Sequence, residues 1–304
     1  MIANTHETRP LYALGFRLAA MVMLAVMFAS VKWLSGHGVH IVESLFYRQL
    51  LALPVPIVAM IMADGLSMTR TKRPGAHVSR TLLGLTGMVF NFGAVILLPL
   101  AEATTIGFTV PIFATILSVI FLGERPGVHR WAAIFIGFLG VVVIIGAPGH
   151  FDLPWLGFIV ALTAAILTSC ITLLLRQISS TEHPTTTVFY FSVLSLPILG
   201  VGMLYFGKMH DAQTWAVIIL LGISGGLAQL FMTSALRWGP VSLVLPMDYS
   251  SLLWSTLLGW ALWQQWPGPG TWIGAVIIAM SSLYIAWRER VRHRELVNRG
   301  VSVS

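Results

Sequence analysis

The sequence predicts an all-α membrane protein with ten transmembrane helices. Its 304 residues are 57% hydrophobic and only 10% charged, and the mean hydropathy is +0.85. Soluble proteins carry about 25% charged residues, so this chain lacks the polar side chains needed to cover a normal surface in water. Ten apolar runs account for most of the chain, and each is close to the roughly 20 residues that cross a bilayer as a helix.

Short segments rich in charged and turn-forming residues separate the apolar runs. The ten helices are expected at residues 12–34, 41–63, 81–101, 103–122, 128–146, 154–176, 185–206, 213–236, 241–263 and 271–287. Lipid offers the backbone no hydrogen bonds, so runs of this length must be helices, whereas a barrel strand needs only about ten alternating residues. The first run is too long for a signal peptide and lacks a cleavage pattern, so we expect a retained helix.

The distribution of Lys and Arg predicts an inner-membrane protein with both termini in the cytoplasm, because basic residues concentrate in cytoplasmic loops. Of 18 Lys and Arg residues, only Lys32, Arg48 and Lys208 fall on the outer half, and the other fifteen, Arg17 and Arg80 among them, fall on the cytoplasmic half. The basic C-terminal tail then meets anionic lipid headgroups. The net charge of +7 is spread over several loops and this tail, which argues against a nucleic-acid partner.

A weak repeat divides the chain into halves of five helices. Pro126-Gly127 recurs as Pro267-Gly268, and Trp131 recurs as Trp272, at a spacing of 141 residues. An odd number of helices forces the second half to insert upside down relative to the first, as in many secondary transporters. The expected units are a first repeat at 1–147, a second repeat at 148–290 and a basic cytoplasmic tail at 291–304.

Several ionisable side chains lie where hydrocarbon penalises charge. They are Lys32, Glu43, Arg48, Glu102 and Asp248. A charge at the bilayer centre costs roughly 2.5–3.5 kcal/mol on insertion scales, so each requires a protein or water neighbour. Lys32 could instead extend to the outer headgroups, and Glu43 is expected at the interface, in contact with water.

Two of these charges, Arg48 and Asp248, lie deepest. Arg48 could form a structural pair with Glu43 or Glu102, or it could bind substrate. Asp248 could pair with Arg237 or with neighbouring hydroxyl groups, although a position in a cavity is our preferred interpretation. The sequence alone leaves these alternatives open.

Several uncharged residues also lie well inside the predicted helices. Asn91 and Gln229 lie well inside helices 3 and 8 and could either join helices or face a cavity. Trp254 lies mid-helix, six residues after Asp248, and could form the wall of a pocket or part of the core. Gly222 and Gly226 have the spacing typical of close helix packing.

Pro111 and Pro246 lie inside the fourth helix of each half. Proline removes a backbone hydrogen bond and leaves a carbonyl free. Interrupted helices at matching positions of two halves are a pointer to a transport site, and a simple kink is the alternative.

These residues give the chain a resemblance to the drug/metabolite transporter superfamily, in its EamA-type ten-helix branch. The stretch from Leu98 to Phe113, closing in Phe121-Leu122-Gly123-Glu124-Arg125, is similar to the family's fourth-helix signature. Arg48, within Phe46-Tyr47-Arg48-Gln49, resembles the family's second-helix arginine. Lys32 resembles a lysine of a subgroup that includes uptake carriers.

The second half departs from the family pattern. Pro246-Met247-Asp248-Tyr249 resembles the family's Pro-x-x-Tyr element, but Gln264-Gln265 replaces the closing Gly-Glu-Arg. The resemblance implies two inverted five-helix repeats, with helices 1 to 4 and 6 to 9 around a central cavity. It also implies transport of small organic metabolites by alternating access.

We therefore expect a secondary transporter for a small organic metabolite that is amino-acid-like, nucleoside-like or vitamin-like and carries an anionic group. The candidate substrate-binding residues are Lys32, Arg48, Asn91, Glu102, Phe108, Gln229, Asp248, Tyr249 and Trp254. The two cations would attract the anionic group, the aromatic side chains would hold an apolar body, and a carboxylate could bind an ammonium or a coupling proton.

Two other classes of protein compete with this interpretation. One is a membrane-embedded enzyme acting on a lipid or isoprenoid, but the nine histidines are scattered, which argues against a metal site, and nothing indicates a cofactor. The other is a channel or lipid-binding scaffold. The expected partners are the small-molecule substrate and membrane lipids, and the sequence leaves a homodimer open.

Overall fold

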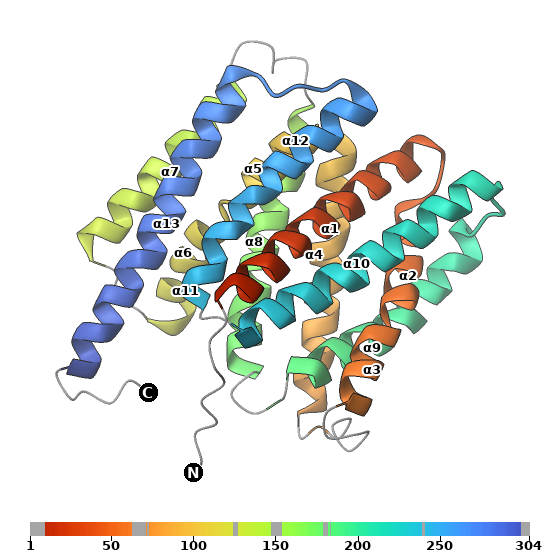
Figure 1. Cartoon of the computed structure of the whole chain (residues 1–304), viewed down its shortest axis with the longest axis horizontal. Helices are drawn as coiled ribbons and strands as arrows, with labels where there is room; N and C mark the ends of the chain where they lie inside the picture. Colours follow the sequence, from red (N-terminus) through yellow and green to blue (C-terminus); the bar gives the residue numbers. More distant parts are fainter. Residues whose placement is uncertain are drawn as a thin grey trace.

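The computed structural model describes residues 10–62, 71, 73–123, 127–146, 154–178, 182, 184–238 and 241–298, folded into helices that run back and forth through one bundle (Figure 1). The first half contains α1 (Pro10–Gly36), α2 (Ile41–Ala52), α3 (Pro54–Met62), α4 (Pro74–Leu97), α5 (Leu100–Gly107), α6 (Val110–Leu122) and α7 (Val128–Gly146). The second half contains α8 (Trp155–Ile178), α9 (Pro184–Phe206), α10 (Ala212–Trp238), α11 (Val241–Val244), the 3₁₀ helix η2 (Leu245–Tyr249), α12 (Ser250–Trp263) and α13 (Pro269–Asn298).

These elements form ten membrane spans, as the sequence predicts. Span 2 is α2 with α3, span 4 is α5 with α6, span 9 is α11, η2 and α12, and every other span is one helix. Among the described residues, eight spans are long and apolar enough to cross a membrane, and α7 adds a shorter apolar stretch at Trp131–Gly146. Span 9 is the tenth, and η2 divides it. We call the end where α1 begins and α13 ends the terminal end, and the opposite end the distal end (Figure 1).

The packing of the helices has the symmetry of two repeats. Helix α1 packs along α10, and α8 packs along α4, so a shift of five spans converts the first pair into the second. The pair α2 and α10 corresponds in the same way to the pair α9 and α4. Helices α7 and α13, the last span of each half, pack on each other at one edge of the bundle (Figure 1). The fold is therefore two inverted five-helix repeats.

The helices α6 and α12 end in the same backbone conformation. Gly123, at the end of α6, has φ 65°, and Gln264, at the end of α12, has φ 56°. These two positions are 141 residues apart, the spacing of the sequence repeat. Gln264 is the one non-glycine residue with positive φ in the described chain, and a side chain there costs about 1 kcal/mol. The replacement of Gly by Gln thus leaves the shape of the turn unchanged.

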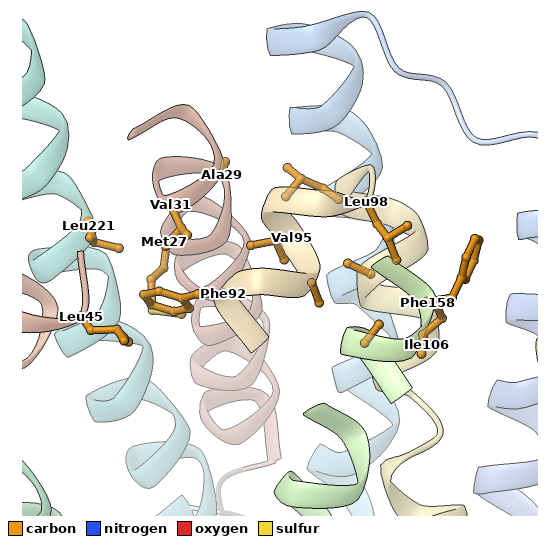
Figure 2. Close-up of a cluster of buried hydrophobic side chains, with 14 of the residues drawn as sticks. Met27, Ala29, Val31, Leu45, Phe92, Val95, Leu98, Ile106, Phe158 and Leu221 are labelled. Atoms are coloured by element: carbon orange, nitrogen blue, oxygen red, sulfur yellow. The ribbon is translucent and has the colours of Figure 1, made fainter. Parts of the chain in front are cut away.

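Buried apolar side chains fill the distal half of the bundle (Figure 2). They come from several spans and include Met27, Val31, Leu45, Phe92, Leu98, Ile106, Phe158 and Leu221. Phe28 and Phe92 meet edge to face, with ring centroids 6.3 Å apart. This cluster joins α1 to α2, α4, α5, α8 and α10.

Glycines allow α7 and α13 to approach closely. A Cβ atom added at Gly274 would lie 2.6 Å from the backbone oxygen of Gly140, and one added at Gly140 would lie 3.0 Å from the oxygen of Gly274. Contacts this short with backbone atoms cannot be relieved by side-chain rotation.

We expect Gly274→Ala to destabilise the protein by about 1–3 kcal/mol, because α13 must move away from α7. Thermal unfolding of the purified protein in detergent measures this. Gly15→Ala is the matched control, since a Cβ at Gly15 of α1 has no neighbour within 4 Å. Equal unfolding temperatures for the two variants would contradict the close packing of α7 and α13.

Candidate functional site

The interior of the bundle contains a cavity of about 510 Å³, which we call the central cavity. Its wall is mostly apolar and includes Phe28, Ala94, Phe108, Ala164 and Tyr249. These residues come from α1, α4, α8 and the segments around the two interrupted spans. The rings of Phe108 and Tyr249 meet edge to face, with centroids 4.8 Å apart, so one residue from each half contributes to an aromatic corner.

The interruption of span 4 borders this cavity. Helix α5 ends at Gly107 and α6 begins at Val110, with Pro111 in its first turn. Hydroxyl groups of two other helices lie at carbonyls of the break: Ser282 Oγ donates to the oxygen of Phe108 (3.0 Å), and Ser169 Oγ lies 2.8 Å from the oxygen of Val110 and 2.7 Å from that of Ala165 in its own helix. The break that Pro111 predicts is thus confirmed, and hydroxyl groups of neighbouring helices supply hydrogen bonds there that lipid cannot offer.

Span 9 is interrupted at the matching place. Pro246 lies in η2, where the chain tightens into a 3₁₀ helix. The hydroxyl of Ser251 donates to the backbone oxygen of Asp248 at 2.6 Å. This local turn places the side chain of Asp248 in the wall of the central cavity. Both predicted interruptions therefore lie at the same cavity.

Asp248 forms a two-pronged ion pair with Arg17 of α1. Arg17 Nε lies 2.5 Å from Oδ1, and Nη2 lies 2.6 Å from Oδ2. The Arg17 side chain is 6% exposed, whereas that of Asp248 is 32% exposed. The pair joins span 1 to span 9, and one face of the carboxylate remains open to the cavity. Such bidentate pairs are among the strongest charged hydrogen bonds in proteins.

Asp248 has a partner that the sequence does not suggest. Sequence reasoning named Arg237, whose side chain lies outside the described residues, or neighbouring hydroxyl groups, and it counted Arg17 only among the cytoplasmic charges. Arg17 and Asp248 are 231 residues apart, so no local pattern links them. The available signal was that Arg17 falls inside the first apolar run.

A second cavity of about 230 Å³ lies beside the first, between α2, α3, α4, α9 and α10; we call it the arginine chamber. Arg48, Asn91 and Gln229 line it together with Arg80 and Thr168. Asn91 and Thr168 also line the central cavity. Arg48 and Asp248 therefore lie in two adjoining cavities rather than in one, and sequence reasoning did not single out Arg80.

Three other candidate residues lie outside the lining of both cavities. Lys32 Nζ donates to the backbone oxygens of Val95 (3.1 Å) and Leu98 (2.6 Å), at the C-terminal end of α4. There it neutralises the negative end of the helix dipole. Glu102 accepts a hydrogen bond from Thr271 Oγ1 at 3.0 Å, and the indole Nε1 of Trp254 is buried with no hydrogen-bond partner among the described residues.

The environment of Glu43 corrects another expectation. Its side chain is 0% exposed rather than in contact with water. It accepts hydrogen bonds from the backbone N–H groups of His40 (3.2 Å) and Lys208 (3.1 Å) and lies 3.0 Å from His210 Nε2. Glu43 thus caps α2 and ties it to the α9–α10 turn. Arg48 pairs with neither Glu43 nor Glu102; its Nη1 donates to Gln49 Oε1.

Two inverted halves with interrupted helices around an internal cavity define a membrane transporter. Comparison with known families agrees: the EamA-like transporter family matches residues 11–146 and 155–287. The chain belongs to this family, which is part of the drug/metabolite transporter group. It is a multi-pass membrane protein that transports small metabolites and is not an enzyme.

Named relatives carry several different metabolites. A riboflavin transporter of Rhizobium johnstonii is 31% identical over 76% of each chain. An S-adenosylmethionine uptake transporter of Rickettsia felis is 26% identical over 92% of this chain and 94% of its own. The pseudopaline exporter CntI of Pseudomonas aeruginosa is 25% identical over 88% of this chain and 93% of its own. A crystal structure with a TM-score of 0.60 and 22% identity covers 91% of this chain and 97% of that chain, which supports the fold.

We expect Asp248→Asn to lower the stability by about 1–3 kcal/mol, because it leaves the buried guanidinium of Arg17 without its counter-ion. The cost is below the ~3–5 kcal/mol of a fully buried pair, since Asp248 is partly exposed to the cavity. Thermal unfolding of Asp248→Asn, Arg17→Gln and the double variant measures the loss of stability in each. The double variant should recover at least half of the loss; strictly additive losses would show that the two side chains are not coupled.

Proposed function

We propose that this transporter carries a flat heterocyclic metabolite of about the size of a flavin or nucleoside, with its ring system in the central cavity. The observation that carries the proposal is the cavity of about 510 Å³ with an aromatic corner. Sites for small organic ligands occupy about 300–1,000 Å³ and are mostly apolar, with a few polar groups that fix orientation. The central cavity has both properties.

The aromatic corner suits a flat ring. The edge-to-face arrangement of Phe108 and Tyr249 presents one ring face and one ring edge from opposite halves of the protein. Thr104 of α5 and Ser255 of α12, whose hydroxyl oxygens are 2.8 Å apart, add polar groups to the same wall. Such groups can orient the carbonyl and N–H edges of a heterocycle. The similarity to riboflavin transporters is consistent with this assignment.

The charges favour an uncharged ring over a cationic one. S-adenosylmethionine carries a sulfonium cation, which a free carboxylate would stabilise best when water is excluded. Asp248 is the acidic residue in the described lining of the central cavity, and Arg17 already occupies both of its oxygens. A neutral ring such as that of riboflavin therefore suits this arrangement better.

We further propose alternating access across the inner membrane, with both termini in the cytoplasm. The Arg17–Asp248 pair joins spans 1 and 9 on the terminal side of the cavity, and the apolar cluster of Figure 2 closes the distal side. Separation of Arg17 from Asp248 would free span 1 to move relative to span 9.

Counterflow in proteoliposomes tests the substrate. We expect riboflavin loaded inside the vesicles to accelerate entry of labelled riboflavin, because a carrier exchanges bound substrate. Phe108→Ala and Tyr249→Ala should each lower the rate about two- to tenfold, the worth of one aromatic contact. Trp266→Ala is the control, since Trp266 is 62% exposed outside the cavity.

Two results would contradict the proposal. Counterflow of S-adenosylmethionine but not of riboflavin would show that Asp248 is released to hold a cation. Riboflavin flux without acceleration by internal riboflavin would indicate a channel rather than a carrier.

A further inference from the structure

The arginine chamber contains two cations, and no carboxylate of the described residues lines it. Arg48 and Arg80 both line this cavity of about 230 Å³, and their like charges repel each other. Neither guanidinium forms an ion pair with a carboxylate anywhere in the described chain. Buried charges in proteins are normally paired, so this arrangement is unusual for a region that serves only for packing.

The guanidinium groups also have unused hydrogen-bond donors. Arg48 Nε, Arg80 Nε and Arg80 Nη1 are buried and have no hydrogen-bond partner among the described residues. An unsatisfied buried donor is costly, and more so when it carries charge. The donors of both residues would be satisfied together by one oxyanion in the chamber, since guanidinium groups bind carboxylate and phosphate oxygens in a fixed fork.

Glycines make room for both arginine side chains. A Cβ atom added at Gly84 would lie 2.0 Å from Arg80 Nη1, and one added at Gly225 would lie 3.2 Å from Arg48 Nε. Arg80 also lies over the ring of Phe191, 4.3 Å from its centroid. The two side chains are therefore packed against helices α4, α9 and α10.

A thin wall separates the chamber from the central cavity. Asn91 and Thr168 line both spaces. Asn91 Nδ2 donates to Thr168 Oγ1 at 3.2 Å and to the backbone oxygen of Gly87 at 2.8 Å. A ligand whose ring lies in the central cavity therefore needs only to displace or pass this pair to reach the arginines.

We propose that Arg48 and Arg80 form a compact-oxyanion subsite, which binds the phosphate or carboxylate substituent of the cargo while its ring lies in the central cavity. The placement of the ring rests on the function proposed above, whereas the binding of a free oxyanion does not. Arg48 and Arg80 contact the anion directly, and Asn91 forms the boundary between the two parts of the ligand.

Inorganic phosphate alone tests the subsite. The unfolding temperature of the purified full-length protein is measured in increasing phosphate or acetate, with ionic strength kept constant by sodium chloride. We expect a saturable increase, because a ligand that binds only the folded state stabilises it. Comparison of the two titrations shows whether the subsite prefers a phosphate or a carboxylate. No saturable increase with either anion would overturn the proposal.

Arg80→Gln and Gly84→Ala should abolish or weaken this increase, the second because its methyl group displaces the guanidinium. The control is Arg288→Gln in α13, a residue outside the lining of both cavities, and it should retain the increase. Without ligand, Arg80→Gln should unfold at the same or a higher temperature, since it removes a repelling charge. A lower temperature together with a retained phosphate effect would mean that Arg80 is structural and would overturn the proposal.

A pair of flavins separates this inference from the proposed function. We expect riboflavin 5′-phosphate to bind about tenfold or more tightly than riboflavin to the wild type, and equally tightly to Arg80→Gln. Riboflavin counterflow with no preference for the phosphate ester would overturn the subsite and leave the proposed function intact. A phosphate effect that depends on Arg80, without any flavin binding, would support the subsite and overturn the proposed function.

Discussion

Hydrocarbon offers no hydrogen bonds, and this constraint shapes the interior of the transporter. Spans 4 and 9 are broken where Pro111 and Pro246 prevent a regular helix, so backbone groups are exposed inside the bundle. Hydroxyl groups of Ser169 and Ser282 on neighbouring helices bind the exposed carbonyls of span 4. Because these helices must stay close to the break, they also become walls of the central cavity. The site is thus a consequence of how the protein satisfies its own backbone.

Buried charged residues also need partners within the protein, and the structure provides these partners in different ways. Lys32 is fully engaged with the end of α4, and Glu43 with the end of α2, so both stabilise the distal end of the bundle. The Arg17–Asp248 pair is equally well bonded but faces the cavity. Arg48 and Arg80 differ, since among the described residues they have neither a counter-ion nor partners for all of their buried donors. A buried charge without a partner is the feature that most directly indicates a place for a ligand.

Several site features could be predicted from sequence because they depend on local rules. The prolines predict the broken helices, and Asp248, two residues after Pro246, lies in the irregular turn of span 9. The partner of Asp248 could not be predicted, since Arg17 is 231 residues away and differs from other basic residues only by lying inside an apolar run. The role of Arg80 could not be predicted for a similar reason, because a basic residue near the start of a span usually reflects only the orientation of the protein in the membrane. In the structure the guanidinium of Arg80 lies against Gly84 and over the ring of Phe191, so it turns inward.

The sequence by itself determined the ten spans, the odd number in each half and the interrupted fourth span of each repeat, because hydropathy, helix length and proline act locally along the chain. The tertiary structure alone decided which charges meet. Helix packing brought Arg17 to Asp248, sealed Glu43 against the α9–α10 turn, and divided the interior into two adjoining cavities at Asn91 and Thr168. These outcomes depend on which helix faces touch, and contacts between distant spans leave no periodic trace in the sequence.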